Sequence, residues 1–273
     1  MPEDTARSDA VRPLPDEVRE AMARYLQKLD AALPGFASMV YLTGSVALDS
    51  FQSGHSDVDA LVVTARPAGA TDLAAVAAVH AGLRGRPHLD AVYLDRVTFA
   101  AQPADGRIVP YVVNGEFRAA APCGELNPVL WLTLRRYGVP VRGPAVAELG
   151  LRTDPAERRR WNLDNLRAYW QPWAEGARRE TASLPGDARV DAEAVTWGVL
   201  GPARLHFTLA YDDVTTKAGA GEYVARHFPA WAALADRAVA WRASGAGEFT
   251  VADLRDAADA VDAVAADAWR RWG

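Results

Sequence analysis

Apolar residues recur every three or four positions near the start of this chain and predict an amphipathic helix: Val18, Met22, Tyr25, Leu29 and Leu33. Asp16 is placed to cap this helix, and Pro34-Gly35 to end it. The pattern then changes to short apolar runs bounded by turn residues, which is typical of buried strands. Strands are expected at 38–43, 58–64 and 89–94.

Helical segments lie between these strands. A short helix is expected at 46–51, a turn at 52–56 and an alanine-rich helix at 71–83. Strands that alternate with helices at this rate indicate an α/β layer.

The pattern changes again after Gly143-Pro144, where no alternation of period two remains. Helical spacing links two later sets of apolar residues: Leu163, Leu166, Trp170 and Trp173, then Val251, Leu254, Ala258, Val261, Ala265 and Ala268. We therefore expect the α+β class, with an N-terminal domain of mixed β-sheet and helices over 1–150 and an all-helical C-terminal domain over 151–273.

Composition narrows the class of protein. The 273 residues can bury a sizeable core, and half of them are hydrophobic. The formal charge of −5 argues against a nucleic-acid partner and favours a cationic one. The single cysteine, Cys123, fits a reducing compartment, and the first residues lack the apolar core of a signal peptide. No apolar run reaches the roughly 20 residues that span a bilayer, so we expect a cytoplasmic monomer with no membrane partner.

Two aspartates at the start of the second predicted strand are the first candidates for chemistry. Asp57 and Asp59 flank one valine, so on a strand their side chains project from the same face. Paired carboxylates repel each other, and a hard cation such as Mg²⁺ relieves that repulsion. Taken alone, the pair is explained equally well by a solvated strand edge.

Gly44-Ser45 strengthens the interpretation as a site. The pair follows the first predicted strand, and eleven residues separate it from Asp57. Glycine lets the backbone approach a ligand closely, and a serine hydroxyl can bind phosphate oxygens. Asp90, in the apolar third strand, is costly to bury unless it meets a cation or a substrate proton. The alternative for Asp90 is a charge at a strand end.

Together these residues resemble the signature of the polymerase-β-like nucleotidyltransferase superfamily: Gly-Ser, eleven residues, Asp-x-Asp, and a third carboxylate on a later strand. The whole chain is similar to the aminoglycoside adenylyltransferases that modify streptomycin and spectinomycin. The segments that carry this similarity are YLTGSVALDS (41–50), HSDVDALVV (55–63), NGEF (114–117), LRRYGVPVRGP (134–144), VLGPARLHFTL (199–209) and TTKAGAGEYVARHFP (215–229).

The resemblance implies that ATP and Mg²⁺ bind between the two domains. Asp57 and Asp59 would hold magnesium, and Asp90 would replace the usual glutamate as catalytic base or serve as a third metal ligand. Asp95 is the alternative base. The resemblance also implies a set of residues that contact the nucleotide: Gly44, Ser45, Ser56, Arg204 and Lys217, with Trp241 either stacked on adenine or packed in the core.

For the acceptor, the resemblance is thinner. Phe117 matches a tryptophan that relatives place against streptomycin. The candidates to hold a cationic drug are acidic: Glu193 and Asp191, with Glu125 as a further possibility. Trp170 and Trp173 are candidates for an aromatic wall, although helical core packing explains their spacing equally well.

The resemblance therefore predicts an enzyme that transfers AMP from ATP to a hydroxyl of an aminoglycoside-type antibiotic, with spectinomycin favoured over streptomycin. One alternative is a nucleotidyltransferase for a protein or another small molecule; such enzymes are commonly single short domains, unlike this chain. The other is a catalytically silent nucleotide-binding module, which could dispense with one of the two metal carboxylates.

Overall fold

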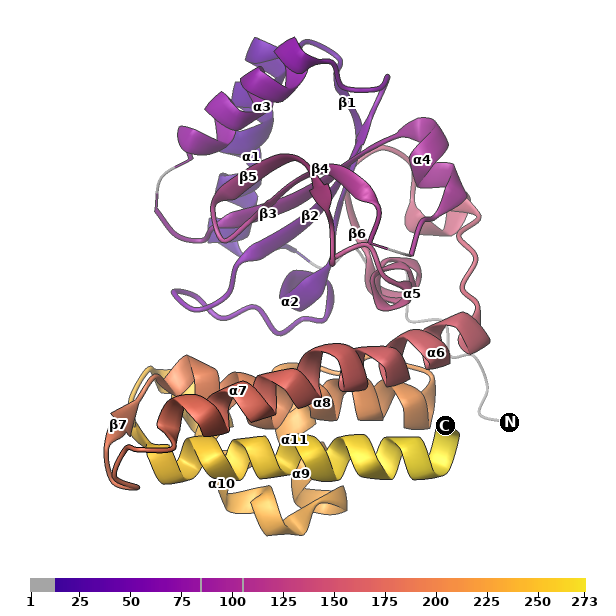
Figure 1. Ribbon diagram of the computed structural model, residues 1–273. Coiled ribbons are helices and arrows are strands. Elements are labelled where there is room, and N and C mark those ends of the chain that lie inside the picture. Colours follow the sequence, from indigo (N-terminus) through magenta and orange to yellow (C-terminus); the bar gives the residue numbers. More distant parts are fainter. Residues whose placement is uncertain (1–12, 84, 105) are drawn as a thin grey trace.

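The computed structural model describes residues 13–83, 85–104 and 106–273. Its elements form two parts that lie one above the other in Figure 1. Below, residues 13–150 are the sheet half and residues 151–273 the helical half. The predicted domain boundary at residue 150 stays a prediction, although the elements change from mixed to mainly helical there.

A six-stranded mixed sheet forms the sheet half, in the order β5-β4-β3-β2-β1-β6. Strands β2 and β3 run parallel, and the other neighbouring pairs are antiparallel. The mixed sheet followed by helices confirms the α+β class. The strands are β1 (Ala37–Leu42), β2 (Val58–Thr64), β3 (Leu89–Asp95), β4 (Ile108–Val113), β5 (Glu116–Pro122) and β6 (Val139–Arg142).

The hairpin of β4 and β5 was not predicted from the sequence. Asn114-Gly115 connects the two strands, and both residues have positive φ angles of 53° and 74°. Positive φ at both positions is what the favoured two-residue hairpin turn requires, and Asn-Gly between apolar residues is its signal. That signal was present in the segment at 114–117.

Alternate strand residues build two cores, one on each face of the sheet. On β2, Val58 and Val62 pack toward helices α1 and α3, whereas Leu61 faces α4 and α5. Because both faces are covered, charged side chains on these strands stand out as costly exceptions. The helices of this half are α1 (Asp16–Ala32), α2 (Gly44–Ala47), α3 (Ala70–Ala81), α4 (Arg96–Ala101) and α5 (Pro128–Tyr137).

Two local predictions are wrong in detail. Pro15, not Asp16, is the N-cap of α1, and no side chain caps this helix. Asp16 is its first residue and pairs with Arg19 at 2.9 Å. The short helix α2 begins at Gly44, two residues earlier than expected, so the strand β1 passes almost directly into it.

The helical half packs around one core in which α8 and α11, its two longest helices, lie side by side. It is not entirely helical, because Arg189–Val190 (β7) pairs with Phe249–Thr250 (β8). Two residues are too few to give a period of two. The helices are α6 (Pro155–Asn165), the π-helical turn η2 (Leu166–Trp170), α7 (Gln171–Thr181), α8 (Ala192–Tyr211), α9 (Lys217–His227), α10 (Ala232–Ser244) and α11 (Val251–Trp272), with 3-10 turns η1 (Val146–Leu149) and η3 (Pro229–Trp231).

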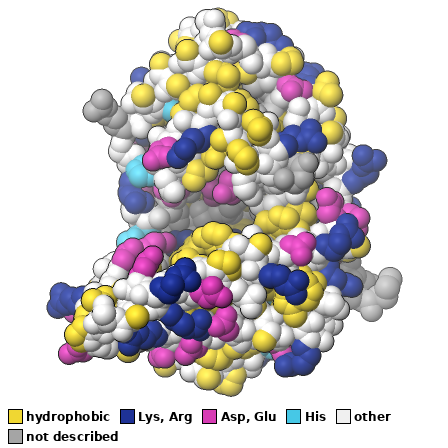
Figure 2. All heavy atoms as spheres, viewed as in Figure 1, with side chains coloured by type: hydrophobic (Ala, Val, Ile, Leu, Met, Phe, Trp, Pro, Cys, Tyr) yellow, Lys and Arg dark blue, Asp and Glu magenta, His cyan; other side chains and the backbone are white. Residues whose placement is uncertain are grey.

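The two halves are joined by polar and aromatic contacts. The Arg136 guanidinium donates to the carbonyl oxygen of Asp212 at 2.7 Å, and the Tyr137 hydroxyl donates to Asp213 Oδ2 at 2.8 Å. Elsewhere on the boundary the His55 ring meets Trp241 edge-on, with centroids 6.4 Å apart. The surface is hollowed into a groove between the halves (Figure 2). In the described part of the chain, no helix has the length and apolar character needed to cross a membrane.

Candidate active site

Three carboxylates gather where β2 and β3 begin. Asp59 and Asp90 are register partners on these parallel strands, so their side chains lie next to each other on one face of the sheet. Asp57 immediately precedes β2. The sequence predicted that these three residues would act together, and the strand register brings them together.

The surroundings of this acidic group raise the pKa values of its carboxylates, so they bind protons more tightly than ordinary aspartates. Burial, followed by the charges of Glu125, Asp90 and Asp57, raises the pKa of Asp59 to about 7. Burial also raises the pKa of Asp90 to about 6, and the nearby charges of Asp57 and Glu125 act in the same direction. Crowded carboxylates without a bound cation have such values, because each ionised group opposes ionisation of the next.

The hairpin turn fixes the orientation of Asp90. The backbone N–H of Asn114 donates to Asp90 Oδ1 at 3.0 Å. This bond favours the ionised carboxylate and partly offsets the effect of burial on its pKa. The segment at 114–117 therefore contributes to the site through its backbone.

Gly44 makes room for Asp59. Its φ of +56° is in the left-handed region, and a Cβ atom added there would lie 1.8 Å from Asp59 Oδ2. Only glycine satisfies both the conformation and the close approach. Next to it, Ser45 Oγ is buried and has no hydrogen-bond partner among the described residues. A buried hydroxyl without a partner is a candidate for ligand contact.

The loop before β2 places Ser56 and Asp57. Ser56 is buried, and its hydroxyl oxygen accepts from the backbone N–H of Gln52 at 3.0 Å, which closes the predicted turn. Asp57 Oδ1 lies 3.7 Å from an Arg86 guanidinium nitrogen and 3.6 Å from His88 Nδ1, beyond hydrogen-bond distance. This oxygen is buried and makes no hydrogen bond with the described residues.

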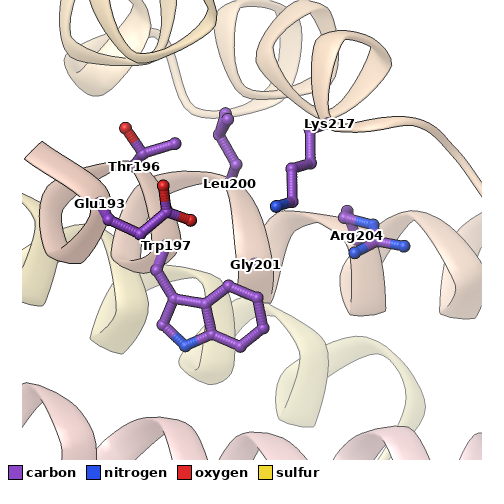
Figure 3. Close-up of a pocket in the computed structure, with 7 residues that line it drawn as sticks. All are labelled: Glu193, Thr196, Trp197, Leu200, Gly201, Arg204 and Lys217. Carbon is purple, nitrogen blue, oxygen red and sulfur yellow. The ribbon is translucent and has the colours of Figure 1, made fainter. Parts of the chain in front are cut away.

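The helical half presents basic side chains to these acids. Arg204 of α8 and Lys217 at the start of α9 line one pocket, together with Glu193 and Trp197 (Figure 3). Asp59 and Glu125 interact electrostatically with Arg204, although burial lowers its pKa. Burial lowers the pKa of Lys217 to about 8, and the charge of Arg242 adds to this effect. Arg204 and Lys217, both candidates from the sequence, therefore share one pocket, and both interact electrostatically with Asp59.

The pocket also contains an acid and an aromatic face. Glu193 is exposed in the first turn of α8, and its Oε1 lies 3.6 Å from an Arg242 guanidinium nitrogen. The Lys217 ammonium lies 6.0 Å from the centroid of the Trp197 ring, above its face. Trp197 donates from Nε1 to the Tyr169 hydroxyl at 3.1 Å. Trp197 was not singled out by the sequence, although it lies one helical turn after Glu193.

Glu125 belongs to the acidic group more closely than the sequence indicated. It precedes α5, and its charge raises the pKa of Asp59 more than those of Asp90 and Asp57 do. Burial raises the pKa of Glu125 above its ordinary value, and the charge of Arg204 offsets part of this shift. No local pattern marks it, because its neighbours in the site come from other parts of the chain.

The strand register places Phe117 on the face of the sheet opposite Asp90. In the strand register Phe117 pairs with Val112, and Val112 pairs with Ala91, so all three face α1 and α3. Asp90, the residue before Ala91, faces the opposite side of the sheet. Phe117 packs against the core and cannot stack on a ligand held beside Asp90.

Trp170 also lies behind the site. Its side chain is 3% exposed, and a Cβ atom added at Gly201 would lie 2.1 Å from its ring. The absence of a side chain at Gly201 lets the indole pack directly against α8. The expectation that Trp170 forms a wall of the acceptor pocket is therefore not supported, whereas Trp197 does line the pocket.

Two further candidate acids cap helices. Asp95 is the N-cap of α4 and accepts from the backbone N–H groups of Val97 and Thr98. Hydrogen bonds from that turn lower its pKa, which makes it a poor base. Asp191 is the N-cap of α8 and accepts from the N–H of Glu193 at 3.0 Å. Both residues therefore have structural roles.

The residues present fit a divalent cation, although no three His, Cys, Asp or Glu side chains among the described residues are already arranged to hold one. Hard cations prefer carboxylate oxygens. Asp57 offers a buried oxygen without a hydrogen-bond partner, and Asp59 a carboxylate of raised pKa. A cation here would remove the repulsion between them.

Comparison with known proteins supports the architecture. No family model and no curated protein matches the chain. Among solved structures, the spectinomycin adenyltransferase AAD(9) from Enterococcus faecialis, crystallised with ATP and spectinomycin, matches with a TM-score of 0.68. The match covers 91% of this chain and 99% of that one, at 14% sequence identity. The two proteins share one fold. The similarity includes both the sheet half and the helical half, because it extends over nearly the whole of each chain.

Proposed function

We propose that this protein is an adenylyltransferase that moves AMP from ATP to a hydroxyl of a small cationic acceptor. One observation carries the proposal: Asp57, Asp59 and Asp90 lie together opposite Arg204 and Lys217. Nucleotidyl transfer requires carboxylates that can hold a metal ion and, opposite them, positively charged side chains that can bind phosphates. The fold shared with an adenyltransferase crystallised with ATP supports the same conclusion.

In the proposed reaction, the acceptor oxygen attacks the α-phosphorus of ATP and forms the new O–P bond. The bond from that phosphorus to the bridging oxygen of the β-phosphate breaks, and pyrophosphate leaves. Asp90 takes the proton of the acceptor hydroxyl. Its pKa of about 6 makes it a stronger base than an ordinary aspartate, yet it is still mostly ionised at neutral pH. Because Asn114 occupies Oδ1, Oδ2 is the oxygen that accepts the proton.

The other residues of the site bind and orient the nucleotide. Arg204 and Lys217 bind the triphosphate as guanidinium and ammonium, while Ser45 and Ser56 contribute hydroxyls beside Gly44. Mg²⁺ held by Asp57 and Asp59 would neutralise charge on the phosphates during transfer. We propose that nucleotide and acceptor bind in the groove between the two halves (Figure 2).

The proposed acceptor is an aminoglycoside-type antibiotic, with spectinomycin favoured. Glu193 and Glu125 provide negative charge beside the groove, and Trp197 an aromatic face, which together suit ammonium groups. Spectinomycin is the compound crystallised with the solved adenyltransferase of the same fold. Streptomycin should be the poorer substrate, because the side chain of Phe117 lies on the other face of the sheet and offers no stacking surface.

The test is to incubate the protein with ATP, Mg²⁺ and a panel of acceptors that includes both drugs. Pyrophosphate release should depend on the acceptor, and mass spectrometry should detect the adenylylated drug. Asp59→Asn serves as the inactive control. ATP binding without transfer to any drug would contradict the acceptor class, and failure to bind ATP would contradict the proposed function as a whole.

A further inference from the structure

Arg242 is a buried basic residue in the last turn of α10. No sequence motif marks it as a site residue. The residue is 9% exposed. Within the described part of the chain, its guanidinium donates no hydrogen bond, and its nearest carboxylate oxygen is Glu193 Oε1 at 3.6 Å. Glu193 itself is about half exposed, with 52% of its side chain accessible. A guanidinium has five N–H donors, so one distant and solvated carboxylate leaves most of them available.

The position of Arg242 relates it to both walls of the groove. Its neighbour Trp241 contacts His55, and a Cβ atom added at Gly245 would lie 3.3 Å from the same histidine ring. Both contacts bring the end of α10 against the loop that carries Asp57. The charge of Asp57 accordingly acts on Arg242, whereas Asp59 and Glu125 act on Arg204.

Three basic residues thus converge on one site, because Arg242 also interacts with Lys217 and with Arg204. Burial lowers the pKa of each of the three, and the charge of Arg242 lowers the pKa values of Arg204 and Lys217 further. Such a group is unfavourable unless it meets a polyanion. Four acids act on these basic residues: Asp57, Asp59, Glu125 and Glu193. Asp57 and Asp59 are suited to a cation, which would offset their charge and leave the three basic residues facing less negative charge.

We infer that Arg242 binds the polyphosphate of the nucleotide at the Asp57 side of the groove, as a third basic ligand beside Arg204 and Lys217. This inference rests on the proposed function. A guanidinium offers parallel donors to phosphate oxygens and is less strongly hydrated than an ammonium, so it suits a partly buried phosphate site. Glu193, whose Oε1 lies 3.6 Å from an Arg242 guanidinium nitrogen, lines the same pocket as Arg204 and Lys217.

The test measures binding of MgATP, inorganic tripolyphosphate and adenosine to the full chain by calorimetry. Arg242→Gln should weaken the binding of MgATP and of tripolyphosphate by similar factors, about tenfold to a hundredfold. This is the range expected for loss of one charge-assisted hydrogen bond. Adenosine binding should change by less than about twofold, because it has no phosphate. Arg242→Lys keeps the charge and should lose less than Arg242→Gln.

Two further variants separate ligand contact from a structural role. Glu193→Gln removes the negative charge nearest to Arg242. Tripolyphosphate binding should be unchanged or tighter, because that charge repels the anionic ligand. Arg226→Gln, an exposed arginine on α9, is the matched control and should behave as the wild type. Circular dichroism and the unfolding midpoint establish that each variant is folded.

The outcomes are distinguishable. If the wild type binds MgATP and Arg242→Gln binds MgATP and tripolyphosphate equally well, the inference about Arg242 is overturned while the proposed function stands. An equal loss of tripolyphosphate binding in Glu193→Gln would also overturn it, because Arg242 would then act only by shaping the pocket. If the wild type binds neither compound, the inference and the proposed function fail together.

Discussion

Asp59 and Asp90 are register partners on neighbouring parallel strands, so two carboxylates lie side by side on one face of the sheet. Asp57 and Glu125 add their charges to the same place. A fold that assembles four acids in one region is less stable when all of them are ionised. The protein therefore holds a site whose stability and activity both depend on what neutralises these charges.

Stability should depend on pH through Asp59. Its folded-state pKa of about 7 and that of Asp90, about 6, lie above the ordinary value of 3.8. The folded state therefore binds protons more tightly than the unfolded state, and stability falls as pH rises from about 4 to about 7. Asp59→Asn should be more stable than the wild type at about pH 8, with a smaller gain at about pH 5.

Urea unfolding in EDTA across this pH range measures the free energy of unfolding of both proteins. The comparison with Asp59→Asn removes the contributions of the other titrating groups. A difference between the two proteins that is independent of pH would show that Asp59 titrates normally.

Magnesium should bind through Asp57 and Asp59. In the wild type, Mg²⁺ should raise the unfolding midpoint more at about pH 8 than at about pH 5, because metal and protons compete for the same oxygens. Asp57→Asn and Asp59→Asn should each lose this response and abolish transfer while remaining folded. Differential scanning fluorimetry and the pyrophosphate assay provide the two measurements. Near-normal turnover of either variant at saturating Mg²⁺ would mean that the metal ligands are assigned wrongly.

Asp90→Ala should reduce turnover by roughly two to four orders of magnitude, the usual range for a general base, with little change in ATP affinity. Asp90→Glu should restore the activity that Asp90→Ala loses, or improve on the wild type, because the carboxylate is still present. Asp95→Ala is the matched control: it loses a helix cap and about 1 kcal/mol of stability but should keep its turnover.

These variants are assayed by single-turnover and steady-state kinetics. A loss confined to ATP binding in Asp90→Ala would instead identify Asp90 as a third metal ligand. Loss of turnover in folded Asp95→Ala would restore Asp95 as the base.

Gly44→Ala should inactivate the protein. The new Cβ atom would need the space of Asp59 Oδ2, only 1.8 Å away, so the Asp59 carboxylate has to move. Gly35→Ala is the matched control, because Gly35 also has a positive φ, +71°, but nothing lies within 4 Å of its added Cβ. Both variants should lose about 1 to 2 kcal/mol of stability through backbone strain. Only Gly44→Ala should lose Mg²⁺-dependent activity, and equal activity losses in the two variants would contradict the role assigned to Gly44.

Phe117→Ala should lower the stability of the protein and leave binding of the acceptor unchanged. The ring packs against the core under α1 and α3, so its removal should cost about 2 to 4 kcal/mol, somewhat less than for a fully buried phenylalanine. The KM for spectinomycin should be unchanged, since the ring points away from Asp90. Thermal unfolding and steady-state kinetics measure the two effects. A raised KM with unchanged stability would place Phe117 in the acceptor pocket after all.

The sequence alone determined the class of the fold and most of the acidic site. Short apolar runs identified β1, β2 and β3, and helical spacing identified the later helices, because burial leaves a local pattern in the chain. Asp57 and Asp59 could be paired for the same reason, since residues two apart on a strand share a face. The glycine at 44 and the third acid at 90 followed from a recognisable spacing.

Only the tertiary structure decided which side chains share the groove. The family resemblance placed Phe117 beside the acceptor, but the register of β3, β4 and β5 turns it to the face opposite Asp90. Trp170 is buried behind Gly201, while Trp197 lines the pocket. Glu125 and Arg242 have no local signature, because each acquires its role from charges on distant segments. Periodicity records which face of an element is buried, whereas the charge and shape of a site depend on which elements meet across space, and no local pattern encodes that.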